Sequence, residues 1–282
     1  LVSRAVGLDR FLLFPNPQQQ DDGSFQTNTT AYAQAYYDAI DPLGDKTTLT
    51  GWRAANGFGS GSGEEVNVVF GDTRDLGYGR RMTGRRNADG SLAFVVENYL
   101  VGYDDPQLNV DAAVAQDTRW RIGVNAIEFS ATPDGAQAFA KFFNFHPQTG
   151  ARENMVDLDG RGAKAIPGVC LSCHGGRADA LAPGNRFSRL KNSASGAHGD
   201  ARGQLHAFEV DSFVFSERAG FTRAEQEAGL KRLNQFVVCS YPVAASQPQV
   251  VPTGLCDRPA ATDGGWGGGA AALVMHAYGG NG

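Results

Sequence analysis

The sequence predicts an α+β protein, in which an antiparallel β-sheet region is followed by an irregular segment with a few helices. Short runs rich in Val, Ile and Phe fill the region from about Glu65 to Phe145 and are typical of strands. Gly- and Ser-rich sequence with little periodicity follows Gly150 as far as about Gly203. Helical patterns precede the first region and follow the second. We therefore expect two segments, 1–150 and 151–282, packed as one compact unit.

The first segment is expected to begin with a helix and continue as the sheet. The helix is predicted over residues 31–40, because Tyr and Ala recur at helical spacing behind a Thr29-Thr30 cap. The predicted strands are 66–70, 92–101, 120–129 and 139–145, with an Arg-rich strand around Met82. Turn signals at residues 87–90 and 133–135 predict two hairpins.

The second segment contains one strong helix signal. Thr222 and Glu225 form a capping box, and apolar residues then share one face as far as Val238, which predicts a helix over 223–238. The stretch from 151 to about 203 is predicted as loop, and the Gly-rich tail after Tyr241 as irregular.

Composition and charge argue against a nucleic-acid-binding protein and against a membrane-spanning one. A chain of 282 residues with 41% hydrophobic and 20% charged residues suits a soluble globular protein. The formal net charge of -5 does not favour binding to nucleic acid. The sequence contains no run of 18 apolar residues that would predict a transmembrane helix. The chain begins with Leu and lacks the charged start and apolar middle of a signal peptide, so we expect a mature start from which an export signal or lipid anchor has been removed.

The most specific motif is Cys170-Leu-Ser-Cys173-His174, the C-x-x-C-H pattern of covalent haem attachment. Two thiols three positions apart on one turn can each add to a vinyl group of the same porphyrin, and the adjacent imidazole is a good ligand for haem iron. A redox dithiol would require a βαβ unit, and a zinc site would require a fourth ligand and usually a second close pair of cysteines. The motif therefore predicts one covalent haem c.

In residues 167–176 the chain resembles the c-type cytochromes. The resemblance implies haem c, with His174 as an iron ligand, and an exported protein that works in the periplasm, outside the cell or at its surface. The rest of the chain resembles a poorly characterised group of exported bacterial mono-haem proteins, in the stretches 70–79 and 211–216. That second resemblance implies no function.

A low-spin electron carrier needs a second axial ligand opposite His174. The candidates are Met82, Met155, Met275, His146, His198, His206 and His276. Met82 is favoured, because it lies among four arginines, of which Arg81 and Arg85 are expected to bind the haem propionates. The order of residues in small soluble cytochromes c favours Met275 instead, and a packing role for Met82 with solvated arginines stays open. For Met155 a packing role is the simpler interpretation, for His146 a turn role, and for His198 and His206 a surface or hydrogen-bonded role.

Two further patterns have simple structural interpretations. Cys239 and Cys256 are an even pair enclosing a Pro-rich loop, which predicts a disulfide in an exported protein. Asp104-Asp105 and Asp157-Leu-Asp159 resemble fragments of calcium loops without the remaining ligands, so we expect them to cap turns.

Three functions stay open. Electron transfer with a redox partner protein is favoured. The first alternative is a haem enzyme or gas-binding protein with an open distal site, whose distal wall would be the sheet over 66–145. It is similar in architecture to the small cytochromes that oxidise hydroxylamine with a lysine-linked haem, but no pattern assigns that link to Lys141 or Lys164. The second alternative is a structural subunit of an extracellular haem-containing assembly, in which the chain would form homo-oligomers.

Overall fold

The fold is that of a computed structural model of the chain, which describes residues 28–73, 75–131, 138–158, 160, 162–175, 203 and 205–240. The helices are α2 (Thr30–Ile40), α3 (Leu49–Ala55), α4 (Pro106–Ala115), α5 (Gly168–His174) and α6 (Arg223–Cys239), with a 3₁₀ turn at Val210–Ser212. The strands are β1 (Glu64–Asp72), β2 (Gly79–Arg86), β3 (Leu92–Tyr99), β4 (Arg121–Ser130), β5 (Phe139–Phe145), β6 (Met155–Val156), β7 (Lys164–Ala165) and β8 (Phe213–Val214). None of these helices has both the length and the apolar character that crossing a membrane requires.

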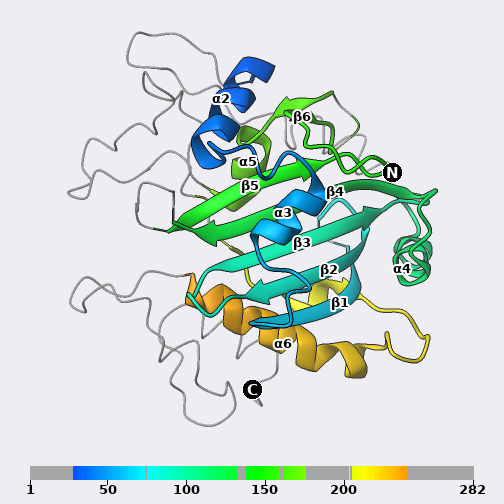
Figure 1. The fold of residues 1–282 in the computed structure, drawn as a ribbon. Helices are drawn as coiled ribbons and strands as arrows, with labels where there is room; N and C mark the ends of the chain where they lie inside the picture. Colours follow the sequence, from blue (N-terminus) through cyan, green and yellow to red (C-terminus); the bar gives the residue numbers. More distant parts are fainter. Residues whose placement is uncertain are drawn as a thin grey trace. The chain divides into compact units, whose positions relative to one another are not determined.

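The predicted α+β class is confirmed by a six-stranded antiparallel sheet with helices around it (Figure 1). The strand order is β5-β4-β3-β2-β1-β8, and β6 and β7 form a separate two-stranded ribbon. The predicted turn at 87–90 is confirmed, because β2 and β3 pair from Arg86 opposite Leu92, and the Asn87 N–H donates to the Ser91 carbonyl. Strands β4 and β5 are also antiparallel, but the turn predicted at 133–135 lies outside the described residues.

Two helices were correctly predicted from their caps. The Thr29 hydroxyl accepts a hydrogen bond from the Tyr32 N–H at the start of α2, and the capping box of Thr222 and Glu225 is present at the start of α6. Helix α5 lies in the stretch that the sequence predicted as loop, so that part of the prediction was wrong. Helices α3 and α4 were not predicted.

The chain divides into two compact units that alternate along the sequence. Unit 1 takes its described residues from Leu1–Gly57 and Val124–Gln204, and unit 2 takes its described residues from Phe58–Gly123 and Leu205–Gly282. These limits do not coincide with the boundary near residue 150 that was expected from the change in sequence character.

In unit 2, helices cover both faces of the sheet formed by β1, β2 and β3. Helix α4 approaches at two glycines of paired strands, since a Cβ on Gly79 would lie 1.8 Å from the Asn109 carbonyl oxygen and one on Gly71 would lie 2.7 Å from Val110. Helix α6 approaches the other face at Gly84, where a Cβ would lie 2.3 Å from Leu233. Glycine at these positions therefore allows close packing of helix on sheet.

In unit 1, β4 and β5 form the centre. Trp52 of α3 is fully buried and packs against Phe143 and Phe145, with ring centroids 6.1 and 6.3 Å apart. Helix α2 lies along β5, where the hydroxyls of Tyr36 and Tyr37 accept hydrogen bonds from the N–H groups of Phe142 and Asn144. These two hydroxyls satisfy backbone groups that an uncovered strand edge would leave unpaired.

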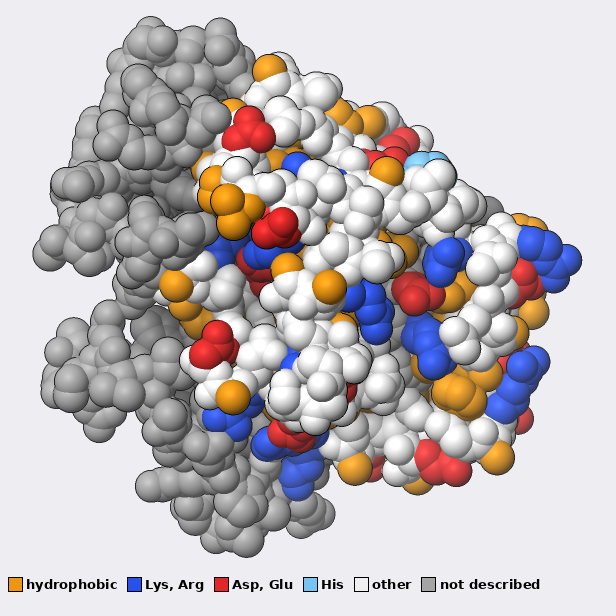
Figure 2. All heavy atoms as spheres, viewed as in Figure 1, with side chains coloured by type: hydrophobic (Ala, Val, Ile, Leu, Met, Phe, Trp, Pro, Cys, Tyr) orange, Lys and Arg blue, Asp and Glu red, His pale blue; other side chains and the backbone are white. Residues whose placement is uncertain are grey.

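The surface carries mixed charges. On the face drawn in Figure 2, acidic and basic side chains are interspersed over the described part of the chain. Several are paired, as Arg232 is with Glu64 and Arg119 with Asp117. This mixture matches the small net charge of the sequence.

Candidate haem attachment site

The three residues of the C-x-x-C-H motif lie on α5. The helix begins after Pro167, whose carbonyl accepts hydrogen bonds from the N–H groups of Cys170 and Leu171 at 2.9 and 3.0 Å. It ends at Gly175, which has a φ of +74° and donates its N–H to the Leu171 carbonyl. Residues three and four apart on a helix are neighbours on one face, so both sulfurs and the imidazole of His174 belong to the same side of α5.

Apolar side chains anchor α5 in unit 1. Val169 and Leu171 are buried, as are Ala165 and Ile166 just before the helix. The Ala165 N–H donates to the Asn28 side chain at 2.7 Å, and Ala165 packs with Tyr32 and Ala33 of α2. The motif therefore sits on a helix that packing holds in place.

The two thiols differ in their surroundings. Neither forms a disulfide in the structure, but Cys170 is half-buried and Cys173 is exposed. Burial raises the pKa of the Cys170 thiol well above its usual range, and the neighbouring Cys173 adds to the increase. A reactive redox dithiol has the opposite property, a lowered pKa that supplies thiolate at neutral pH.

The donor set of α5 fits haem c. Two thiols that form no disulfide, at positions i and i+3, could form two thioethers on one porphyrin, and His174 at i+4 could supply an imidazole for the iron. Within the described residues, no group of three or more His, Cys, Asp or Glu side chains is arranged to hold a metal ion.

No protein-family model, curated protein or solved structure matches the chain. The resemblance to c-type cytochromes therefore rests on residues 167–176.

His174 lies against β5. Its imidazole is half-buried, and its ring centroid is 5.2 Å from that of Phe142, with the two rings tilted by 47°. Side chains alternate between the faces of a strand, so Phe142 points to the α5 side of β5 while Phe143 and Phe145 point to the α3 side.

Met82 lies in unit 2, on β2. Its side chain is 8% exposed, and its cross-strand partners are Val68 and Val96. Met82 shares a strand face with Gly84, the residue that Leu233 of α6 approaches. These apolar surroundings support the packing interpretation of Met82.

Most of the hydrogen-bonding capacity of Arg85 is used within unit 2. Its side chain is 2% exposed, and four of its five N–H groups bond to Glu65, Asn87, the Ser60 hydroxyl and the Ser62 carbonyl. These bonds and the burial of the side chain leave little of Arg85 for the expected bond to a haem propionate. Arg81 is half-buried and lies opposite Val69 and Glu97 in the paired strands.

The surroundings of the other candidate iron ligands within the described residues are as follows. Met155 packs against Tyr32 and Ala165, as the packing interpretation predicted. The Nδ1 atom of His146 accepts hydrogen bonds from the N–H groups of Gln148 and Thr149, so this histidine stabilises a turn. His206 is exposed in unit 2. Outside the described residues lie three further candidates, Met275, His198 and His276.

The two acidic motifs cap turns, as expected. Asp105 accepts a hydrogen bond from the Leu108 N–H at the start of α4. The carboxylate of Asp157 accepts from the N–H groups of Gly160 and Gly162, and Asp159 lies outside the described residues. The pairing of Cys239 with Cys256 stays a prediction, because Cys256 also lies outside them.

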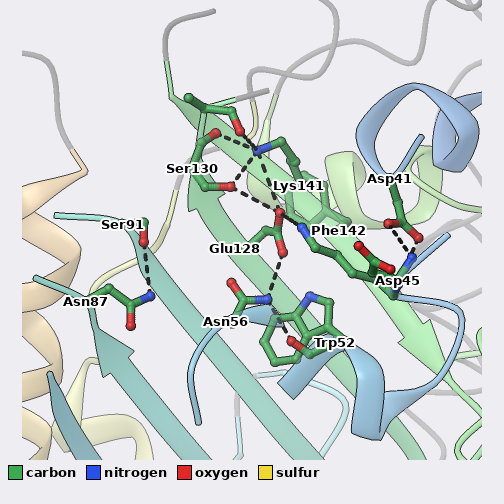
Figure 3. Close-up of polar contacts among 12 residues, drawn as sticks. Asp41, Asp45, Trp52, Asn56, Asn87, Ser91, Glu128, Ser130, Lys141 and Phe142 are labelled. Carbon is green, nitrogen blue, oxygen red and sulfur yellow. Dashed lines mark hydrogen bonds and ion pairs between the residues drawn. The ribbon is translucent and has the colours of Figure 1, made fainter. Parts of the chain in front are cut away.

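Lys141 belongs to a buried charged cluster with Glu128 on the α3 side of β5 (Figure 3). Its ammonium donates to the Ser130 carbonyl, to the Ser130 hydroxyl at 2.6 Å and to the Ala131 carbonyl at 3.0 Å, and lies 3.7 Å from Glu128. The Glu128 carboxylate also accepts from Lys46 at 2.7 Å and from Asn56 at 2.9 Å. Each of the three ammonium protons of Lys141 therefore has a hydrogen-bond acceptor within the protein.

The charges of this cluster depend on one another. Burial is the main cause that lowers the pKa of Lys141 to about 8; the nearby Glu128 opposes this shift and Lys46 contributes to it. Burial opposes ionisation of Glu128, but the two lysines and Asn56 outweigh it and hold the pKa of that carboxyl below its usual value. The other buried lysine considered for a haem link, Lys164, donates to the Gly162 carbonyl at 3.1 Å.

Sequence reasoning did not find the residues around the motif. Phe142 was assigned only to a strand, and Tyr36 and Tyr37 only to a helix. A signal existed in the run of aromatic residues along β5, but it could not show which of them packs against His174.

Replacement of Met82 tests its role directly. We expect Met82→Leu to leave the haem spectrum unchanged, because Leu fills a similar apolar volume, and to lower the free energy of unfolding by less than about 1.5 kcal/mol. Absorbance spectra of the oxidised protein and urea unfolding measure both effects. Conversion to a high-spin spectrum would show instead that Met82 binds the iron.

Proposed function

We propose that the chain is an exported mono-haem c-type cytochrome that transfers electrons to or from a redox partner protein. The observation that carries the proposal is the arrangement on α5, where the two thiols of the motif and His174 share one face of a packed helix. Export is part of the proposal, because the resemblance to c-type cytochromes implies haem attachment outside the cytoplasm.

In this proposal Cys170 and Cys173 hold the haem covalently and His174 binds its iron. The haem supplies a one-electron couple. The residues of unit 1 hold it in a fixed position: Val169 and Leu171 anchor the helix, and β5 lies against the histidine. A fixed ligand environment keeps the reorganisation that accompanies electron transfer small.

The position of β5 supports a carrier over a haem enzyme. An enzyme of the kind considered from the sequence would use the sheet as the wall of an open distal site. The ring of Phe142 on β5 lies instead next to His174, the iron ligand that belongs to the attachment motif.

Absorbance spectroscopy of the oxidised and reduced protein tests the proposed role. We expect sharp low-spin bands in both states and no change on addition of carbon monoxide, because a carrier has both axial positions filled. A broad high-spin spectrum that shifts with carbon monoxide or peroxide would contradict electron transfer and favour the haem enzyme.

A further inference from the structure

Phe142 is the aromatic residue that lies against His174, and we propose that it is a positioning residue that fixes the orientation of this imidazole at the haem iron. The proposal rests on the proposed function, because it gives Phe142 this role only if His174 binds iron. Phe142 itself touches neither the iron nor a substrate in the proposal and acts through His174.

The backbone of Phe142 is held from the side of α2. Its N–H donates to the Tyr36 hydroxyl at 2.9 Å, and its side chain is 1% exposed. The neighbouring N–H along the same edge, that of Asn144, donates to Tyr37. Two hydrogen bonds from one helix therefore fix the segment of β5 that carries the ring.

Gly203 limits the movement of the Phe142 ring. A Cβ placed on Gly203 would lie 2.4 Å from Cζ and 2.7 Å from Cε2 of Phe142, and 3.3 Å from Leu171 of α5. The backbone of Gly203 therefore lies directly against the ring, and Leu171 lies beside both. Any side chain at 203 would have to displace the ring of Phe142, which lies next to His174.

The orientation of a histidine ligand is normally set by its neighbours rather than by the metal. A hydrogen bond to the outer ring nitrogen usually fixes the plane of the ring, and a side chain packed against the imidazole restricts the same rotation. A tilted aromatic pair at 5.2 Å is within the range in which rings attract each other. Phe142 thus restricts rotation of the imidazole from one side, while α5 directs it from the backbone.

The contact can be tested without haem. In the haem-free full-length chain, NMR should show the ring protons of His174 shifted by the ring current of Phe142, and Phe142→Leu should abolish that shift. The matched control is Phe143→Leu, which removes an equally buried ring from the next position of β5 on its other face. Unchanged His174 signals in Phe142→Leu would overturn the proposal.

The consequence for the ligand is tested in the haem-containing protein. Without the ring of Phe142 the imidazole is freer to rotate, which weakens its bond to the iron. We expect the high-spin fraction of the oxidised protein, measured by electron paramagnetic resonance, to rise in Phe142→Leu but not in Phe143→Leu. Equal spectra of the two variants would reduce Phe142 to a packing residue and overturn the proposal.

A second variant perturbs the same contact from the opposite side. Gly203→Ala should push the Phe142 ring and change the spectrum of the haem protein, whereas the same substitution in the Phe142→Leu background should add little, because the smaller side chain leaves room. Additive effects would contradict a shared contact. Absence of haem from the unaltered protein would refute the proposed function, while the NMR measurement would still decide whether Phe142 orients His174.

Discussion

Replacement of both Cys170 and Cys173 by Ser is expected to leave a protein without covalently bound haem. A hydroxyl does not form the thioether that each thiol forms with a porphyrin vinyl group, so denaturation should release whatever haem is still present. Haem absorbance of the protein band after denaturing electrophoresis measures the loss. Of the single variants, Cys173→Ser retains the Cys170 thiol and should keep the haem through one thioether.

The matched control for this experiment is Ser172→Ala. Ser172 lies between the two cysteines on the same turn, is exposed, and donates its hydroxyl to the Gly168 carbonyl at 3.3 Å. This variant should keep its haem. Covalent haem in the double cysteine variant would show that attachment occurs elsewhere.

Lys141→Met should change how stability depends on pH. In the folded protein the pKa of Lys141 is lowered from 10.5 to about 8, first by burial. Between these values the unfolded chain binds more protons than the folded one, so Lys141 makes the protein more stable as pH rises. Relative to the variant, the unaltered protein should gain about 1.5 kcal/mol of unfolding free energy between about pH 8 and about pH 9.5.

The difference in unfolding free energy between the unaltered protein and Lys141→Met reports on Lys141, because the other titratable groups are present in both proteins. The buried hydroxyls of Tyr36 and Tyr37 have raised pKa values, caused mainly by burial, and they affect both chains equally. Phe145→Leu is the control, since it removes a buried ring from the same strand face without removing a charge. Urea unfolding at the two pH values measures the effect, and a constant difference between Lys141→Met and the unaltered protein would be evidence against a lowered pKa.

The sequence was sufficient where local chemistry determines structure. Thr29 and the pair Thr222 and Glu225 marked the starts of α2 and α6, because a cap is a hydrogen bond between close neighbours in the chain. The strand at 139–145 was predicted with its observed limits, because its β-forming residues are continuous.

Two helices were missed because their signals are short. Helix α4 begins with Asp105 as a cap and Pro106 in its first turn, which is a recognised start signal, but its apolar residues show no clear stripe. Helix α3 has only seven residues and buries mainly Trp52. Such helices are stabilised by packing rather than by their own sequence.

The sequence could not predict which residues that lie far apart in the chain contact one another. Arg85 was expected to bind a propionate, but its partners are Glu65 on the paired strand and two serines of the preceding glycine-rich loop. Nothing in the local sequence distinguishes these acceptors from a cofactor's carboxylate. Likewise, strand periodicity puts Phe142 on a face of β5 without showing that α5 covers that face.

The mass of the intact protein, measured after export in a bacterium and denaturation, tests the central claim most directly. The account predicts that the unaltered chain is heavier than its sequence by one haem, and that the addition survives denaturation, because Cys170 and Cys173 bind it covalently. A mass equal to that of the sequence alone, from cells that attach haem to other c-type cytochromes, would contradict it.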